Sequence, residues 1–309
     1  MKVHRDIDNL PEFRNAVVTI GTFDGVHMGH RQILDKLKEE ATAINGETVI
    51  ITFHPHPRKV ISSTILGIRL INTLEERLQL LEQHGIDHVV IVPFTEAFAN
   101  QPAEDYVQHF LVNKFKPHTI IIGYDHRFGR DRLGDYKLLE KKAIDYNYRL
   151  KEIPKHILDN ISISSTNIRE AILHNDTETA NLLLGYEFFF SGVVVHGDKI
   201  GRTLGYPTAN LKVQDEEKIT PGNGIYAVYA SLPGNNQRLK GMMSIGFRPT
   251  VDGKRRVIEV NLFDFSEEIY GQTLTVYVKK YLREEVKFEG LEALVKQIDQ
   301  DKIDSLAVL

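Results

Sequence analysis

The chain of 309 residues contains no cysteine. This absence excludes disulfide bonds, zinc sites with cysteine ligands and catalysis by a thiol. A basic excess is missing too, since the formal net charge is −4, which argues against a protein that neutralises many phosphates along a nucleic acid. No apolar run approaches the roughly 20 residues of a membrane span, and the polar segment 1–15 does not resemble a signal peptide. We therefore expect a soluble, cytoplasmic protein without nucleic-acid or membrane partners.

The first part of the chain, from Ala16 to about residue 184, alternates short β-branched runs with amphipathic helical patterns. The apolar runs are at 16–23, 47–53, 87–94 and 118–123, and the helical patterns are at 31–44, 73–85 and 103–115. Near-continuously apolar strands separated by helices of this length are typical of a parallel sheet covered on both faces. We predict a doubly wound α/β domain over residues 1–184, with its ligand outside the carboxyl ends of the strands.

From residue 185 onward the pattern changes to strands divided by turn signals such as PGNG and PGNN. The expected strands are at 186–197, 224–232, 239–247, 254–265 and 272–282, and a terminal helix is expected at 291–306. Short strands without intervening helices indicate an antiparallel sandwich or closed barrel. The chain is long enough for two domains, so we predict an all-β domain over residues 185–309 with the terminal helix packed on it.

The decapeptide GTFDGVHMGH, residues 21–30, directly follows the first apolar run. Gly21, Gly25 and Gly29 allow the backbone to approach a ligand closely, and the start of a helix offers free N–H groups to an anion. His27 and His30 are three residues apart, so they project from one face of that helix. This pattern predicts an anion site whose imidazoles stabilise charge that develops on a phosphate.

A second glycine-rich stretch, HGDKIGRTLGYPTANL, occupies residues 196–211 and combines glycines with basic side chains. It does not satisfy GxxxxGK[ST], so it is not a Walker A loop. In the run VIEVNLFDF, the apolar Ile258, Val260 and Leu262 share one strand face, and Glu259 therefore points the other way. A carboxylate placed in that manner can act as a general base toward a hydroxyl group.

These stretches resemble the bacterial bifunctional riboflavin kinase/FAD synthetase family. The decapeptide matches the longer form GxFDGVHxGH of the HxGH signature of nucleotidyltransferases, and PTAN at 207–210, preceded by GRTLGY, is similar to riboflavin kinases. Further matching stretches are FHPHPR at 53–58, GYDHRFGRDRLGD at 123–135, ISSTNIRE at 163–170, EEIYGQTL at 267–274 and YVKKYLREEVKF at 277–288. The resemblance covers nearly the whole chain.

For residues 1–184 the resemblance implies a Rossmann-like nucleotidyltransferase domain that joins FMN to the α-phosphate of ATP, which gives FAD and pyrophosphate. His27 and His30 would bind the ATP phosphates and stabilise the transition state, and His126 stands where the family commonly has an apolar or aromatic residue. The other implied ATP contacts are Gly21, Phe23, Gly25, Gly29, Ser164, Ser165, Thr166 and Arg169, and the implied flavin contacts are His56, Asp125, Arg127 and Arg130.

For residues 185–309 the resemblance implies a riboflavin-kinase-like β-barrel that phosphorylates riboflavin to FMN with ATP. The family's catalytic glutamate maps onto Glu259, and Thr208 and Asn210 would supply hard oxygen ligands to Mg²⁺. Arg283 would line the flavin site. The implied phosphate contacts are Gly197, Lys199, Gly201, Arg202 and Gly205.

These stretches can also be interpreted as purely structural features. The decapeptide can be a glycine-rich turn, ISST can simply cap a helix, the charges of 125–130 can be solvated, and His56 between two prolines can mark a rigid turn. Three other functions are open: a class I aminoacyl-tRNA synthetase, a flavin-binding regulator without activity, and an enzyme that keeps one of the two activities. The first is disfavoured because ISSTNIR lacks the lysines of a KMSKS-like loop.

Overall fold

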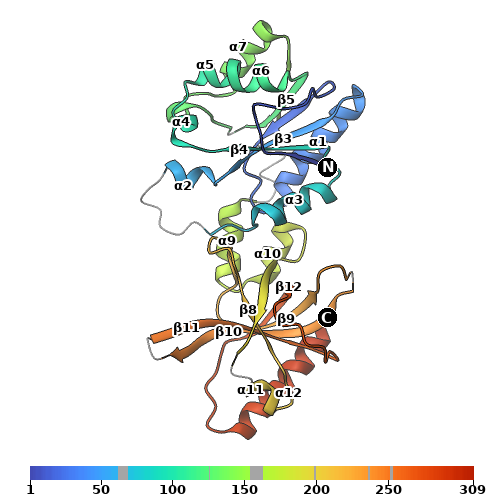
Figure 1. Cartoon of the computed structure of the whole chain (residues 1–309), viewed down its shortest axis with the longest axis vertical. Coiled ribbons are helices and arrows are strands. Elements are labelled where there is room, and N and C mark those ends of the chain that lie inside the picture. The colour runs from blue at the N-terminus through green and yellow to red at the C-terminus, as the bar shows by residue number, and fades with distance from the viewer. Residues whose placement is uncertain (62–68, 125, 154–162, 198–199, 236, 251–252) are drawn as a thin grey trace. The chain divides into compact units, whose positions relative to one another are not determined.

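A computed structural model describes residues 1–61, 69–124, 126–153, 163–197, 200–235, 237–250 and 253–309 (Figure 1). The chain forms two compact units, Met1–Ser165 and Thr166–Leu309, and each is described by itself. Two of the predicted contacts, Asp125 and Lys199, lie outside the described residues. The unit boundary precedes the predicted domain boundary at 184, so the intervening helices belong to the second compact unit.

The first unit is built on a six-stranded sheet in which every pair of neighbouring strands is parallel. Its order is β1 (Lys2–His4), β4 (His88–Pro93), β3 (Thr48–His54), β2 (Val17–Ile20), β5 (Thr119–Gly123) and β6 (Arg149–Ile153). The predicted doubly wound α/β architecture is confirmed. The two edge strands, β1 and β6, were not expected, because short polar runs such as KVH carry no strand signal of their own.

Apolar strands in the middle of the sheet are buried on both faces, as parallel pairing requires. All four residues of β2 are buried, as are Thr48–Phe53 of β3 and Thr119–Ile122 of β5. The connecting helices are α1 (Met28–Ala43), α2 (Pro57–Ile61), α3 (Leu74–Gln83), α4 (Glu96–Ala99), α7 (Tyr136–Tyr146) and the 3₁₀ turn η2 (Arg130–Arg132). Strand order reverses direction at β2, since β3 pairs with one side of it and β5 with the other. The loop after β2 therefore lies at the switch point where such sheets bind ligands.

The helix expected over 103–115 is interrupted by a π-helical segment. It consists of α5 (Ala103–Asp105), the π-helix η1 (Tyr106–Val112) and α6 (Asn113–Phe115). The wider turn buries Tyr106, and its ring stacks on Phe128 with centroids 4.8 Å apart. Apolar periodicity cannot distinguish a π-turn from an α-turn over so short a segment.

The second unit begins at Thr166, the second residue of α9 (Ser165–Leu173), and continues through α10 (Thr177–Leu184) into a closed barrel (Figure 1). The strands are β7 (Phe189–Val195), β8 (Ala209–Lys212), β9 (Gly224–Ser231), β10 (Leu239–Thr250), β11 (Gly253–Leu262) and β12 (Thr273–Arg283), and the short α11 (Ile200–Thr203) precedes β8. All neighbouring strands are antiparallel, in the order β10-β11-β8-β7-β12-β9. The terminal helix α12 (Leu291–Val308) packs on β9, β10 and β12. The predicted barrel with a terminal helix is confirmed.

Candidate active sites

The loop between β2 and α1 has a backbone conformation that L-residues rarely adopt. Phe23, Gly25 and Val26 have φ values of 49°, 93° and 36°. The value at Val26 is unfavourable because a β-branched side chain crowds the left-handed region. Such strain, about 1–3 kcal/mol for each non-glycine residue, persists only where surrounding contacts enforce it, and it is common at ligand sites.

The two histidines of this loop are packed against each other. His27 is the N-cap of α1, and its Nδ1 accepts the backbone N–H of His30 at 3.3 Å. The two rings are stacked with centroids 3.7 Å apart, and Phe23 lies 5.0 Å from the His30 ring. A Cβ on residue 29 would lie 3.3 Å from the His27 ring, so Gly29 makes room for this packing. The loop therefore joins a helix N-terminus and two imidazoles at one place.

Burial sets the charge state of His30. Desolvation lowers the pKa of its imidazole well below 6.5, and the positive charges of His27 and Arg77 lower that pKa further. The ring is therefore neutral near pH 7. Its Nδ1 is buried and has no hydrogen-bond partner within the described part of the chain. A neutral imidazole with an unused nitrogen can donate to or accept from a bound ligand.

Buried polar contacts hold the loop from behind. The Asp24 carboxylate accepts the backbone N–H groups of Ile71 at 2.9 Å and Asn72 at 3.1 Å. The Ser165 hydroxyl donates to the Asp24 carbonyl at 2.9 Å, which brings the ISST stretch to the loop. From α3, the Arg77 guanidinium donates to the Thr22 carbonyl.

The other predicted residues of the first site are less closely associated in the structure. His56 is buried, and its Nδ1 accepts the backbone N–H of Arg58 at 3.2 Å. Arg127 and Arg130 are exposed, and Arg127 pairs with Asp135 at 3.2 Å. Ser164 is half-buried in the first unit, whereas Thr166 and Arg169 belong to the second. The His126 ring lies 5.8 Å from Phe128.

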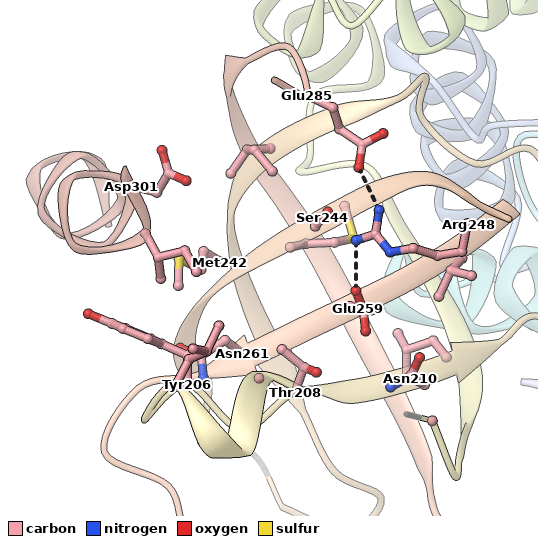
Figure 2. Close-up of a pocket in the computed structure, with 18 of the residues that line it drawn as sticks. Tyr206, Thr208, Asn210, Met242, Ser244, Arg248, Glu259, Asn261, Glu285 and Asp301 are labelled. Carbon is pink, nitrogen blue, oxygen red and sulfur yellow. Dashed lines mark hydrogen bonds and ion pairs between the residues drawn. The ribbon is translucent and has the colours of Figure 1, made fainter. Parts of the chain in front are cut away.

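The barrel of the second unit contains a cavity of about 730 Å³ (Figure 2). Glu259 points into it from β11, with its side chain 25% exposed. Arg248 of β10 donates one guanidinium nitrogen to Glu259 at 3.2 Å and another to Glu285 at 3.3 Å. The predicted base is thus held by an arginine that two carboxylates share.

Strand pairing brings the PTAN segment to the same cavity. Asn210 of β8 lies directly opposite Glu259 of β11, and Thr208 and Asn210 both line the cavity (Figure 2). A Cβ on residue 197 would lie 2.3 Å from the Asn210 amide nitrogen, so Gly197 leaves space for that side chain. A Cβ on residue 201 would lie 2.3 Å from the Tyr206 carbonyl oxygen, and Gly205 has a φ of 81°. Glycine is therefore required at 201, where the clash is with backbone, and is favoured at 205 by its positive φ, whereas a side chain at 197 would displace the Asn210 amide.

A smaller cavity of about 310 Å³ lies beside the first, and Thr208 lines both. Arg202 lines the smaller cavity and lies 4.0 Å from the Glu268 carboxylate. Ala209 and Val260 also line the smaller cavity, while their neighbours Asn210 and Glu259 line the larger one. This alternation follows from the two-residue period of a strand.

Arg283, predicted to contact the flavin, lines the larger cavity and is held by the terminal helix. Its Nε and Nη2 donate to the two carboxylate oxygens of Asp301 at 2.7 and 2.6 Å. Gln297 donates to the same carboxylate at 3.0 Å. Since Leu294 and Ile298 also line the cavity, α12 forms one of its walls.

Four charged residues of these sites were missed in the sequence: Arg77, Arg248, Glu285 and Asp301. Two of them carried a usable signal. Arg77 lies three residues after Leu74 and four before Leu81, and Asp301 lies three after Ile298, so both occupy the apolar stripe of their helix. A charged residue in that stripe is buried and needs a partner. The isolated Arg248 and Glu285 offered no such signal.

Neutral oxygen atoms, rather than a cluster of carboxylates, would have to hold any metal ion at the larger cavity. Among the residues with described positions, no group of three or more His, Asp or Glu is arranged to hold a metal. Thr208 and Asn210 supply two oxygen donors, and the space over Gly197 accommodates the Asn210 amide. This donor set suits Mg²⁺ that keeps most of its ligands as water and phosphate oxygens.

In the described ranges, no helix has both the length and the apolar character needed to cross a membrane.

Comparisons with known proteins extend over both units. The family model described as FAD synthetase matches residues 10–167, and the one described as riboflavin kinase matches residues 184–309. A bifunctional riboflavin kinase/FMN adenylyltransferase from Escherichia coli K12 is 37% identical over 98% of this chain and 96% of that protein. The protein of the same name from Listeria monocytogenes is 36% identical over 95% of this chain and 92% of its own length.

The fold as a whole also occurs in a solved structure. A crystal structure described as a macrolide-efflux protein from Streptococcus pneumoniae has a TM-score of 0.87, with 29% sequence identity and coverage of 98% of both chains. The likeness therefore includes the sheet, the barrel and the terminal helix.

Proposed function

The chain belongs to the bifunctional riboflavin kinase/FMN adenylyltransferase family, and from this premise we propose that residues 1–184 carry adenylyl transfer and residues 185–309 carry phosphoryl transfer. The two reactions form FMN from riboflavin and FAD from FMN, with ATP as the second substrate of each. The ranges of the two family models support the division. The observation that carries it furthest is the position of Glu259, which faces Asn210 inside the barrel cavity.

In the kinase reaction, the larger cavity takes riboflavin, because Glu259 lines only that cavity and must reach the flavin hydroxyl. The hydroxyl oxygen attacks the γ-phosphorus of ATP, its proton passes to Glu259, and the bond from the γ-phosphorus to the β-phosphate oxygen breaks to release ADP. The smaller cavity takes the nucleotide, whose phosphates reach the larger cavity beside Thr208. Gly197 and Gly201 line the larger cavity and Arg202 the smaller one, which supports their assignment to the phosphates, and Lys199 and Gly205 are assigned to them from sequence.

Thr208 and Asn210 would hold Mg²⁺ together with ATP phosphate oxygens. The ion would neutralise charge on the phosphates and orient them toward the acceptor hydroxyl. Arg283 would contribute to flavin binding through the shape of the cavity rather than by a free cation, because Asp301 takes two of its guanidinium nitrogens.

In the adenylyl transfer, a phosphate oxygen of FMN attacks the α-phosphorus of ATP, and the bond to pyrophosphate breaks. His27 and His30 would stabilise the charge on the α-phosphate, and the loop with Gly21, Phe23, Gly25 and Gly29 would contact the nucleotide. Ser164, Ser165, Thr166 and Arg169 would contact ATP phosphates, and His56, Asp125, Arg127 and Arg130 would contact the flavin. No covalent enzyme intermediate is required, so the chain acts by positioning and electrostatics.

The decisive experiment supplies the purified protein with ATP and Mg²⁺ and either riboflavin or FMN, and separates the products by chromatography. We expect FMN and then FAD from riboflavin, and FAD alone from FMN. A protein that consumes neither flavin would refute the proposal, and one that uses only FMN would assign the barrel another role. The cytoplasm, which holds ATP in a reducing environment, is the proposed compartment.

A further inference from the structure

We propose that Arg77 is a positioning residue for adenylyl transfer, which holds the 21–27 loop in its active shape through the Thr22 carbonyl. The inference rests on the assignment of adenylyl transfer to that loop. It adds a residue from α3, a helix that contains none of the loop's ligand-facing groups.

Arg77 makes its side-chain hydrogen bonds at the base of the loop through Nη1, while its buried Nε has no partner in the described part of the chain. Its Nη1 donates to the Thr22 carbonyl and, at 3.2 Å, to the Thr52 hydroxyl. The Thr52 hydroxyl itself lies 3.3 Å from the same Thr22 carbonyl, to which it donates. Thr22 thus accepts from two buried donors immediately before the backbone enters its left-handed stretch at Phe23.

Removal of the Arg77 guanidinium from water costs free energy, and its contacts with the loop explain why it is buried. The residue is 3% exposed, and desolvation lowers the pKa of its guanidinium, an effect that the charge of Asp24 opposes. A buried guanidinium stabilises a fold only when its donors are well used, and replacement of buried charges by apolar groups is often neutral or favourable. An arginine on the apolar stripe of α3 is therefore explained by its hydrogen bond to the Thr22 carbonyl of the loop.

Arg77 also contributes to the electrostatics of His30. The rings that pack on His30 are His27 and Phe23. Burial lowers the pKa of the His30 imidazole most, and electrostatic interactions with His27 and with Arg77 of α3 lower it further. Asp24, fixed by the backbone N–H groups of Ile71 and Asn72, supplies the nearby negative charge. A permanent guanidinium at the Thr22 carbonyl keeps positive charge near the loop when His30 is uncharged, which favours phosphate.

The test compares Arg77→Met, which removes charge and donors at similar length, with Arg77→Lys, which keeps the charge, and Thr52→Val, which removes only the bridging hydroxyl. For FAD formation from FMN, we expect Arg77→Met to lower kcat by roughly 10- to 100-fold, with a smaller change in KM for ATP. The acidic limb of its pH profile should move to higher pH, because loss of the guanidinium charge removes one of the effects that lower the pKa of His30. Arg77→Lys should restore the pH profile but only part of kcat, and Thr52→Val should lower kcat less without moving the profile.

Two controls separate this role from general damage. FMN formation from riboflavin should be unchanged in all three variants, since it takes place in the other unit. Arg14→Met removes an exposed cation from the first unit and should leave both reactions unchanged.

Wild-type kcat and pH profile in a folded Arg77→Met protein would overturn the proposal. If that variant does not fold, unchanged kcat in both Arg77→Lys and Thr52→Val would overturn it equally. His30→Ala distinguishes a wrong assignment of the adenylyl-transfer site from a wrong role for Arg77. If His30→Ala retains full FAD synthesis, the assignment of the site fails and this inference fails with it, whereas an inactive His30→Ala beside a fully active Arg77→Met rejects Arg77 alone.

Discussion

Glu259 and Asn210 face each other directly across the β8–β11 pair, so a carboxylate and an amide oxygen enter one cavity from adjacent strands. The register of the barrel fixes this relationship. A general base and a ligand for a phosphate-bound ion can therefore be tested as separate parts of one site.

Glu259→Gln keeps the shape of the side chain and removes its capacity to accept the flavin proton. We expect kcat for FMN formation to fall about 100-fold or more, within the usual range for loss of a general base. FAD formation from FMN should be unchanged in the same preparation. Equal losses in both reactions would contradict separate sites.

Asn210→Ala removes the proposed metal ligand without touching the base. Titration of the kinase reaction with Mg²⁺ at fixed ATP should require roughly 10-fold more metal, as expected when one ligand of several is lost. Asn210→Asp keeps an oxygen donor and should lie closer to the wild type. A metal dependence that is identical in all three proteins would exclude a ligand role for this residue.

Arg248 is expected to orient Glu259, since it bridges that carboxylate and Glu285 (Figure 2). Arg248→Met should lower kcat for FMN formation by roughly 10-fold, because a displaced base transfers the proton less efficiently. Arg238→Met is the matched control: Arg238 pairs with Glu187 at similar exposure, 48% against 47%, and lines neither cavity. Similar kcat values for both variants would show that the Arg248 pair has no catalytic consequence.

Asp301→Asn leaves Arg283 without its carboxylate partner. Because the Asp301 side chain is only 4% exposed, we expect the variant to lose about 3 kcal/mol of unfolding free energy in the second unit. KM for riboflavin should rise as the wall formed by α12 loosens. Asp304→Asn changes a carboxylate on the same helix whose one hydrogen bond, within the described part of the chain, comes from exposed Gln300, and its denaturation curve should match the wild type.

The lowered pKa of His30 predicts a pH-dependent stability of the first unit. Because the folded-state pKa lies below the unfolded value of 6.5, the unfolded chain binds the proton first as the pH falls. The stabilisation is therefore complete above about pH 6.5 and is lost as the pH falls toward the folded-state pKa. Hydrogen exchange of α1 amides, corrected for intrinsic rates, should show a larger loss of protection between pH 7.5 and 5.5 in the wild type than in His30→Gln. The same loss in both would mean that other groups dominate.

The features that could be predicted from the sequence are those that local residue patterns determine. Long apolar runs identified the central strands of both units, and the decapeptide was expected to form an anion site at the carboxyl end of the first strand, because glycines and histidines follow that strand. Strand β8 was not identified as a strand, although its residues were singled out for chemistry. Its four residues, ANLK, form a strand only because β7 and β11 flank them.

The missed charges depend on tertiary contacts that local patterns do not contain. Arg248 and its partner Glu285 are 37 residues apart in the sequence. Arg77 and its partner Thr22 are 55 residues apart. Only Arg77 and Asp301 carried a signal in the sequence, since each lies in the apolar stripe of its helix. Pairings of this range follow from strand register and helix docking, which emerge when the fold is complete.

Thr208 borders both cavities of the barrel, so the flavin and the nucleotide would lie close together beside this residue in the proposed arrangement. A synthetic compound that carries a flavin-like ring and an adenosine-like group would need a linker of just a few atoms to occupy both. Such a ligand would gain affinity from the high effective concentration of its second half. The threonine is thus a natural point from which to design selective inhibitors of vitamin B2 activation.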